Sequence, residues 1–147
     1  MPIRDHLKKI LWHIITPVYP LFRDILRMVG YKPYPARQDY HIGWLNPKKT
    51  LEQFQKFLES LGFCKNKIAW IDDGEILSLR LKENFRYQYH VRLFNDNEIR
   101  GHYELTPEYS PLDHLRDLET TEKKEEFNKL LNGWLVENQK KTNPTPR

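Results

Sequence analysis

Apolar and polar residues alternate along residues 85–105, and this pattern predicts a β-hairpin. An Asn-Asp-Asn turn at residues 95–97 separates the two strands, and Asn97 tolerates the left-handed conformation that a three-residue loop requires. That loop pairs His90 with His102 and Arg92 with Arg100. A two-residue loop would scramble both faces, because a slip of one residue moves every side chain to the opposite face. The predicted apolar face contains Tyr87, Tyr89, Val91, Leu93, Ile99, Tyr103 and Leu105.

A second hairpin is predicted directly before the first. Residues 67–72 and 75–82 read as strands, and the Asp-Gly pair at residues 73–74 is a strong two-residue turn signal. This turn sets Trp70 opposite Leu77 and Ile68 opposite Leu79, which keeps one side apolar. Four strands with short links form an antiparallel meander.

Helical periodicity appears on both sides of these strands. Asn46 and Pro47 suit the cap and first position of a helix that ends at Gly62. Residues 110–113 resemble a capping box for a short helix to Leu118, and a further helix begins near Thr120. The core-facing residues of the first and last helices are Leu51, Phe54, Phe57, Leu58 and Leu61, and Phe127, Leu130, Leu131, Trp134 and Leu135. The predicted fold class is α+β: a four-stranded antiparallel meander with helices packed on its apolar face.

An amphipathic helical segment precedes this domain. Residues 3–16 and 21–29 place apolar side chains at helical spacing, with Pro17 and Pro20 between the two helices and Gly30 at the end. Such basic helices pack on their own domain or a second subunit, or they lie in a membrane interface. We expect Leu7, Ile10, Leu11 and Ile14 to pack against the domain.

The chain therefore divides into four parts. Residues 1–30 form the N-terminal amphipathic helices, and residues 31–46 form an aromatic connector. We expect this connector to lie over the domain; a surface that stacks on nucleic-acid bases is the alternative. Residues 47–137 form the α+β domain, and residues 138–147 form a flexible polar tail.

Composition indicates one folded domain, with 39% hydrophobic and 30% charged residues over 147 positions. Residues 1–49 carry nine Lys/Arg and three Asp/Glu, which favours an anionic partner for this part. The single cysteine, Cys64, excludes an internal disulfide and a Cys-based zinc site, and its apolar neighbours predict burial. No stretch of about 20 apolar residues and no cleavage signal appear, so the expected location is the cytoplasm.

The face of the 85–105 hairpin opposite the apolar one carries the candidate chemistry. It contains Gln88, His90, Arg92, Arg100, His102 and Glu104. A solvated sheet face has this composition without any function. The functional interpretation starts from Arg92 opposite Arg100, because directly opposed like charges are destabilising and a bound anion would remove the repulsion.

The predicted roles follow from side-chain chemistry. His90 and His102 are the candidate catalytic acid and base for phosphodiester cleavage. Glu104 is the third candidate catalytic residue, which would orient one histidine or share the role of the base. Arg92, Arg100 and Gln88 are the candidate ligand-binding residues. His90, His102 and Glu104 also form the ligand set of a non-haem iron site, but the charges of Arg92 and Arg100 oppose a divalent cation. We therefore expect neither a metal nor another cofactor.

Two function classes result. The first is a small module that binds RNA or another phosphate-bearing ligand on the polar sheet face, with catalysis as an added property. The second is a non-catalytic interaction protein that docks on a membrane surface or a protein partner through residues 1–30. A binding face predicts a concave surface with both histidines exposed, whereas a scaffold predicts a flat or salt-bridged one.

Overall fold

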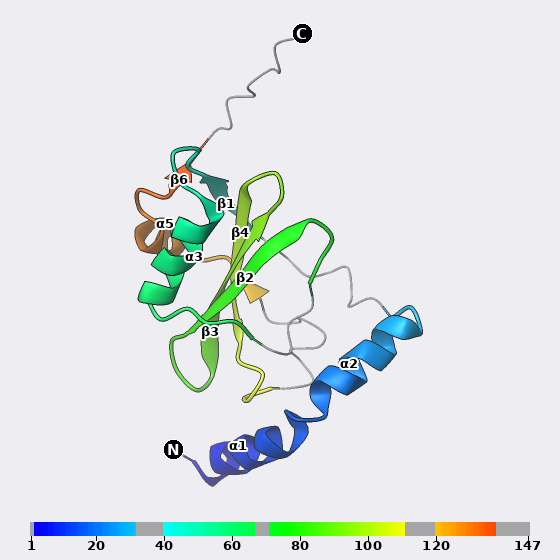
Figure 1. Cartoon of the computed structure of the whole chain (residues 1–147). Coiled ribbons are helices and arrows are strands. Elements are labelled where there is room, and N and C mark those ends of the chain that lie inside the picture. The colour runs from blue at the N-terminus through cyan, green and yellow to red at the C-terminus, as the bar shows by residue number, and fades with distance from the viewer. Residues whose placement is uncertain (1, 32–39, 67–70, 111–119, 138–147) are drawn as a thin grey trace.

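The computed structural model describes residues 2–31, 40–66, 71–110 and 120–137. These residues form the predicted α+β fold, in which an antiparallel sheet carries helices on one face and two further helices lie to the side (Figure 1). The helices are α1 (Ile3–Ile15), α2 (Tyr19–Met28), α3 (Leu51–Ser60) and α5 (Lys124–Leu130). The strands are β1 (Tyr40–Leu45), β2 (Glu75–Lys82), β3 (Tyr87–Phe94), β4 (Glu98–Leu105), β5 (Thr120–Thr121) and β6 (Leu135–Val136).

The sheet order is β2-β3-β4-β1-β6, and β5 pairs with β4 outside this path. Three of the four predicted strands form the consecutive meander β2-β3-β4. The fourth predicted strand covers residues 67–72, of which residues 67–70 lie outside the described residues. The expected pairs of Ile68 with Leu79 and of Trp70 with Leu77 therefore also lie outside them. Ile71 and Asp72 are described and belong to no strand.

The aromatic connector was assigned wrongly over residues 40–45, because these residues form the inner strand β1. The strand pairs with β4, with His41 opposite Arg100 and Trp44 opposite Glu98. A register shift between His41 and Gly43 breaks the alternation that identifies strands. The partner strand is also more than fifty residues away, so local sequence carries no signal for the pairing.

The 85–105 hairpin has the predicted register. His90 pairs with His102, Arg92 with Arg100, and Gln88 with Glu104. Asn97 adopts a φ of +66°, which is the left-handed conformation expected at the end of the loop. The Asn97 carbonyl also accepts a hydrogen bond from the Leu45 N–H at 2.8 Å, so the loop is tied to the end of β1.

The core lies between the apolar face of the sheet and the layer of α3 and α5 (Figure 1). Phe54, Leu58, Phe127 and Leu131 are buried, as the periodicity predicted. Leu51 and Leu61 were also expected to face the core but are exposed, because they lie at the two ends of α3. Helix α3 begins at Leu51 rather than at Pro47, because Thr50 and Gln53 form the capping box. Asn46 instead closes a turn through a 3.0 Å hydrogen bond from the Lys48 N–H to its side-chain oxygen.

The C-terminal part differs from the prediction in two short strands. The last helix was expected to include Trp134 and Leu135, but it ends at Leu130, and Leu135 lies in β6. The short helix expected to run to Leu118 lies outside the described residues, apart from Ser110. Thr120 and Thr121 pair with β4 instead of starting a helix, and α5 begins at Lys124. The acidic residues that follow Lys124 favour this later start, because negative charge is stabilising in the first turn of a helix.

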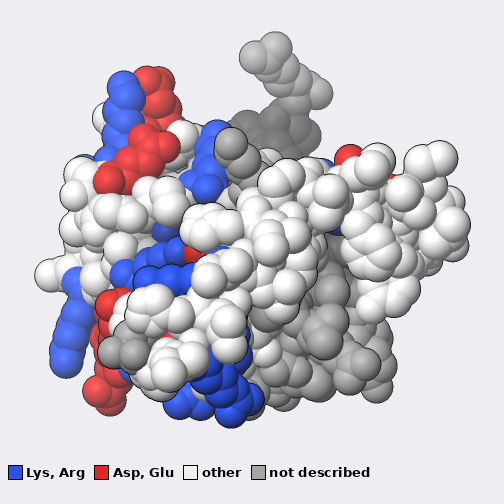
Figure 2. All heavy atoms as spheres, turned by 90° about the horizontal axis from the view of Figure 1, so that it is seen from below, with Lys and Arg blue, Asp and Glu red and all other residues white. Residues whose placement is uncertain are grey.

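Helices α1 and α2 form where predicted, but the expectation that their apolar stripe packs on the domain is wrong. The polar side of α1 faces the domain, with the Lys8 ammonium 3.5 Å from the ring centre of Tyr109 and Lys9 above Phe85. Figure 2 shows that much of the surface on the right of that view is white, with only a few atoms of charged residues. The exposed apolar residues of this surface are Ile3, Leu7, Ile10, Leu11, Ile14, Val18, Leu21, Phe22, Ile25, Met28 and Val29. No helix in the described ranges combines the length and apolar character needed to cross a bilayer.

The loop conformation gives a first testable prediction. Replacing Asn97 with Ala should lower the free energy of unfolding by about 1 kcal/mol, because a left-handed backbone is costly for residues other than Gly and Asn. Asn97→Gly is the matched control and should be as stable as the wild type or slightly more so. Urea denaturation measures both variants, and equal stability of Asn97→Ala and the wild type would contradict the assigned loop.

Candidate functional site: a buried polar cluster

The structure brings the predicted polar residues together on one face of the sheet and adds two more from β2. Ser78 lies opposite Arg92, and Arg80 lies opposite His90, so the alternation of β2 continues the polar face of β3 and β4. Six of these residues form a connected group, which we call the polar cluster. Its members are Ser78, Arg80, Gln88, His90, His102 and Glu104.

The polar cluster is buried, which corrects the expectation of an open binding face. His90 and His102 have no exposed surface, and Arg80 and Glu104 are only 2% and 3% exposed. Ser78 is half-buried and is the most accessible member. Alternation along a strand predicts which side chains share a face, but it does not predict whether that face meets water.

Hydrogen bonds connect the cluster from β2 to β4. The Ser78 hydroxyl lies 2.8 Å from Nε2 of His90, whose Nδ1 lies 3.2 Å from Nε2 of His102. The same Nε2 of His102 lies 3.1 Å from Oε2 of Glu104. A proton can therefore move between a hydroxyl, two imidazoles and a carboxylate without passing through bulk water.

The carboxylate of Glu104 is held by two donors. Nε2 of Gln88 donates to Oε1 at 2.7 Å, and Nε of Arg80 donates to the same oxygen at 3.0 Å. Arg80 and Glu104 thus form a buried ion pair. Removing either member of such a pair is strongly destabilising, because the charge of the other member is then left uncompensated in the interior.

The rest of the Arg80 guanidinium is unusual. Its two terminal nitrogens, Nη1 and Nη2, are buried and have no hydrogen-bond partner among the described residues. Buried polar groups are nearly always hydrogen-bonded, since an unpaired one costs about 1–3 kcal/mol. Arg80 is therefore the cluster residue that most clearly calls for an additional acceptor.

Arg92 and Arg100, in contrast, each have carboxylate partners from the protein. Arg92 pairs with Glu75 and Asp72, and Arg100 pairs with Glu98. Burial by itself would raise the pKa of the Glu98 carboxyl, but hydrogen bonds from Arg100 and His41 outweigh it and hold this pKa below its ordinary value. A bound anion is thus not needed to relieve the repulsion between the arginines, which was the sequence argument for one.

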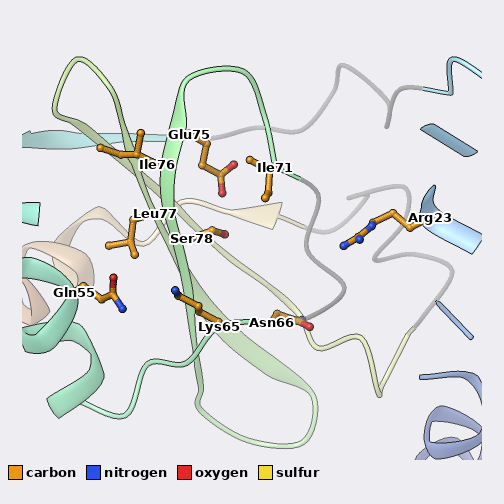
Figure 3. A pocket seen from close by; sticks show the side chains of 9 residues that line it. All are labelled: Arg23, Gln55, Lys65, Asn66, Ile71, Glu75, Ile76, Leu77 and Ser78. Atoms are coloured by element: carbon orange, nitrogen blue, oxygen red, sulfur yellow. The ribbon is translucent and has the colours of Figure 1, made fainter. Parts of the chain in front are cut away.

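A pocket of about 300 Å³ lies at the edge strand β2, beside the cluster (Figure 3). Ser78 and Glu75 line it from β2, and Arg23 points toward it from α2. Because Ser78 also contacts His90, it joins the pocket to the buried histidines. Ser78 is the cluster member that lines this pocket.

Sequence reasoning missed Ser78 and Arg80 as site residues, although it placed both in a predicted strand. The signal was present, because they alternate with Leu77, Leu79 and Leu81 and must share the face opposite those leucines. Cys64 was predicted to be buried but is exposed, and its backbone bridges to Arg80.

No family model, curated protein or solved structure matches the chain. The functional argument therefore depends on the residues themselves. Within the described ranges, His90, His102 and Glu104 are the group whose donor atoms lie close enough together to hold a metal ion.

The buried ion pair gives the second prediction. Glu104→Gln keeps the side-chain shape but leaves the charge of Arg80 uncompensated, and it should reduce the free energy of unfolding by about 3–5 kcal/mol. Glu52→Gln is the control, because Glu52 pairs with Lys56 on the surface and should change stability by less than about 0.5 kcal/mol. Chemical denaturation compares the two variants; similar small effects would show that the ion pair is not important for folding.

Proposed function

We propose that the protein binds a small ligand bearing a phosphate or carboxylate group at the polar cluster, with Arg80 as the anchor. The observation that carries this proposal is the pair of buried Arg80 nitrogens without a partner among the described residues. A guanidinium presents parallel N–H groups that match the oxygens of phosphates and carboxylates. One oxyanion group would satisfy both nitrogens at once.

The surroundings of Arg80 favour a small enclosed ligand over a nucleic acid lying across the sheet. The histidines beside Arg80 are buried, whereas a long polymer needs an open surface. Small-ligand sites are typically enclosed and contain a few convergent polar groups. The pocket at Ser78 offers such a ligand an approach to the cluster.

Acid–base chemistry on the bound ligand is an additional property that this proposal includes. The chain from Ser78 through His90 and His102 to Glu104 supplies groups that exchange protons near neutral pH. Phosphodiester cleavage by His90 and His102 is the specific form of this chemistry that the sequence predicts.

The anion site is tested with inorganic phosphate and acetate as probes. Arg80→Lys keeps a positive charge beside Glu104 but loses the planar fork, so phosphate affinity should fall about tenfold or more. Lys82→Met is the matched control, since Lys82 lies two residues along the same strand but is exposed and pairs with Glu108. Isothermal titration calorimetry measures both variants, and equal phosphate affinity in Arg80→Lys and the wild type would refute the proposal.

A second candidate function rests on α1 and α2. Their exposed apolar surface is continuous with an apolar groove lined by Ile15, Val18 and Phe22, among others. Residues 2–31 carry five Lys/Arg and two Asp/Glu, and Arg4 and Arg27 are exposed. An exposed apolar face accompanied by basic side chains is the pattern of helices that lie in an anionic membrane interface. We propose that these helices attach the domain to such a surface.

Co-sedimentation with lipid vesicles tests this attachment. The wild type should sediment with phosphatidylserine-containing vesicles, less so at high salt, and weakly with pure phosphatidylcholine. Ile10→Glu combined with Ile25→Glu should abolish sedimentation, because both side chains lie on the apolar surface. Ile76→Glu alters an equally exposed isoleucine on the edge strand β2 and should have no effect. A wild type that ignores vesicles and self-associates would instead assign this surface to a second copy of the chain.

A further inference from the structure

We propose that His90, His102 and Glu104 bind a divalent transition-metal ion, of the zinc or iron(II) class. The three side chains come from adjacent positions on β3 and β4, where His90 pairs with His102 and Glu104 follows two residues later. This metal site goes beyond the proposed anion binding and stands without it. Contact between the ion and an anionic ligand bound to Arg80 rests on the proposed function.

The donor atoms have the spacing of metal ligands. Nδ1 of His90 lies 3.2 Å from Nε2 of His102 and 3.7 Å from Oε1 of Glu104, and Nε2 of His102 lies 3.1 Å from Oε2 of Glu104. Bonds from zinc to imidazole nitrogen and carboxylate oxygen are about 2.0–2.2 Å, so two ligands on one ion lie roughly 3.0–3.5 Å apart. One donor atom from each residue lies within 4.8 Å of the other two, so the three side chains would move closer together around an ion placed between them.

The three donor atoms converge on one point from adjacent strands. The carboxylate of Glu104 only accepts, and Nε2 of His102 has at most one proton, although it lies within reach of both Glu104 and His90. A cation placed at the centre attracts the three electron-rich atoms together.

The groups around the three ligands match the supporting contacts of metal sites. A histidine that binds a metal through one nitrogen usually donates the other N–H to a neighbour, and Nε2 of His90 lies 2.8 Å from the Ser78 hydroxyl. A ligating carboxylate is also held by hydrogen bonds, as Glu104 is by Gln88 and Arg80. Ser78, Gln88 and Arg80 thus position the ligands.

The electrostatic objection raised by the sequence does not hold in the structure. Arg92 and Arg100 are paired with Glu75, Asp72 and Glu98, so their charges are largely compensated. Arg80 is compensated by Glu104. A divalent ion would add positive charge beside Arg80, and the anionic ligand of the proposed function would then bind to both the ion and the guanidinium. Three protein ligands leave coordination positions open for such a molecule.

Direct metal binding tests the inference. Protein purified with a chelator, then given Zn²⁺ or Co²⁺ in buffer without phosphate, should retain one ion per chain after dialysis, and Co²⁺ should produce visible absorption bands. His102→Gln should weaken binding at least about 100-fold, and Ser78→Ala about 10-fold as a supporting contact. His41→Gln is the matched control, because His41 also contacts a carboxylate, Glu98, but belongs to no three-ligand group among the described residues.

The outcomes separate the metal site from the anion site. Wild-type protein that retains no ion would overturn the metal site, whatever the variants do. Equal binding by wild type and His102→Gln, with circular dichroism showing both folded, would also overturn it. Arg80→Lys should lose phosphate affinity, and its ion affinity should fall about as far as that of Ser78→Ala, because the substitution also alters a supporting contact of Glu104. Phosphate binding by a protein that takes no metal would leave the anion proposal standing alone.

Discussion

The buried ion pair between Arg80 and Glu104 is the interaction on which the rest of the site depends. Both groups are withdrawn from water, and the pair is stable there only because Glu104 also accepts from Gln88 and lies against His102. The pair joins the edge strand β2 to β4 across the intervening strand β3. It therefore fixes the positions of both histidines while leaving two guanidinium nitrogens available for an acceptor from outside the described residues.

The two faces of the sheet are linked through their common backbone. Gly101 lies opposite Val91 in the hairpin, and a Cβ atom there would stand 2.7 Å from Cδ1 of Ile42 and 2.8 Å from the His90 carbonyl. The missing side chain leaves room on the apolar side for the side chains of Ile42 from β1 and Phe127 from α5. The same strand positions His102 and Glu104 on the polar side, so packing of the core and geometry of the site constrain each other.

The N-terminal helices reverse the usual relation between an amphipathic helix and its domain. Lysines of α1 lie over aromatic rings of the domain, while the apolar stripe faces outward. Trp12 and Tyr19 are the main buried residues of this segment, and they pack on each other with ring centres 6.1 Å apart. Exposure of such a large apolar surface to water is unfavourable, and patches of this kind usually mark an interaction site. A membrane surface is therefore its proposed partner.

Local sequence determined the strands β2, β3 and β4 with their two faces, and the approximate positions of the four helices. Only the tertiary structure determined burial, the pairing of distant strands and the partners of the charged residues. The period of two along residues 85–105, with Asn97 at the loop, was sufficient to predict the register and to place His90, His102 and Glu104 together. The strand β1 was missed because its bulge breaks that period and its partner lies far along the chain. Local sequence could not predict that the polar face is buried. For the same physical reason, it could not predict the carboxylate partners of Arg92 and Arg100 or the position of Arg80 beside Glu104. Periodicity reports the direction in which a side chain points, and contacts between distant segments decide what it meets there.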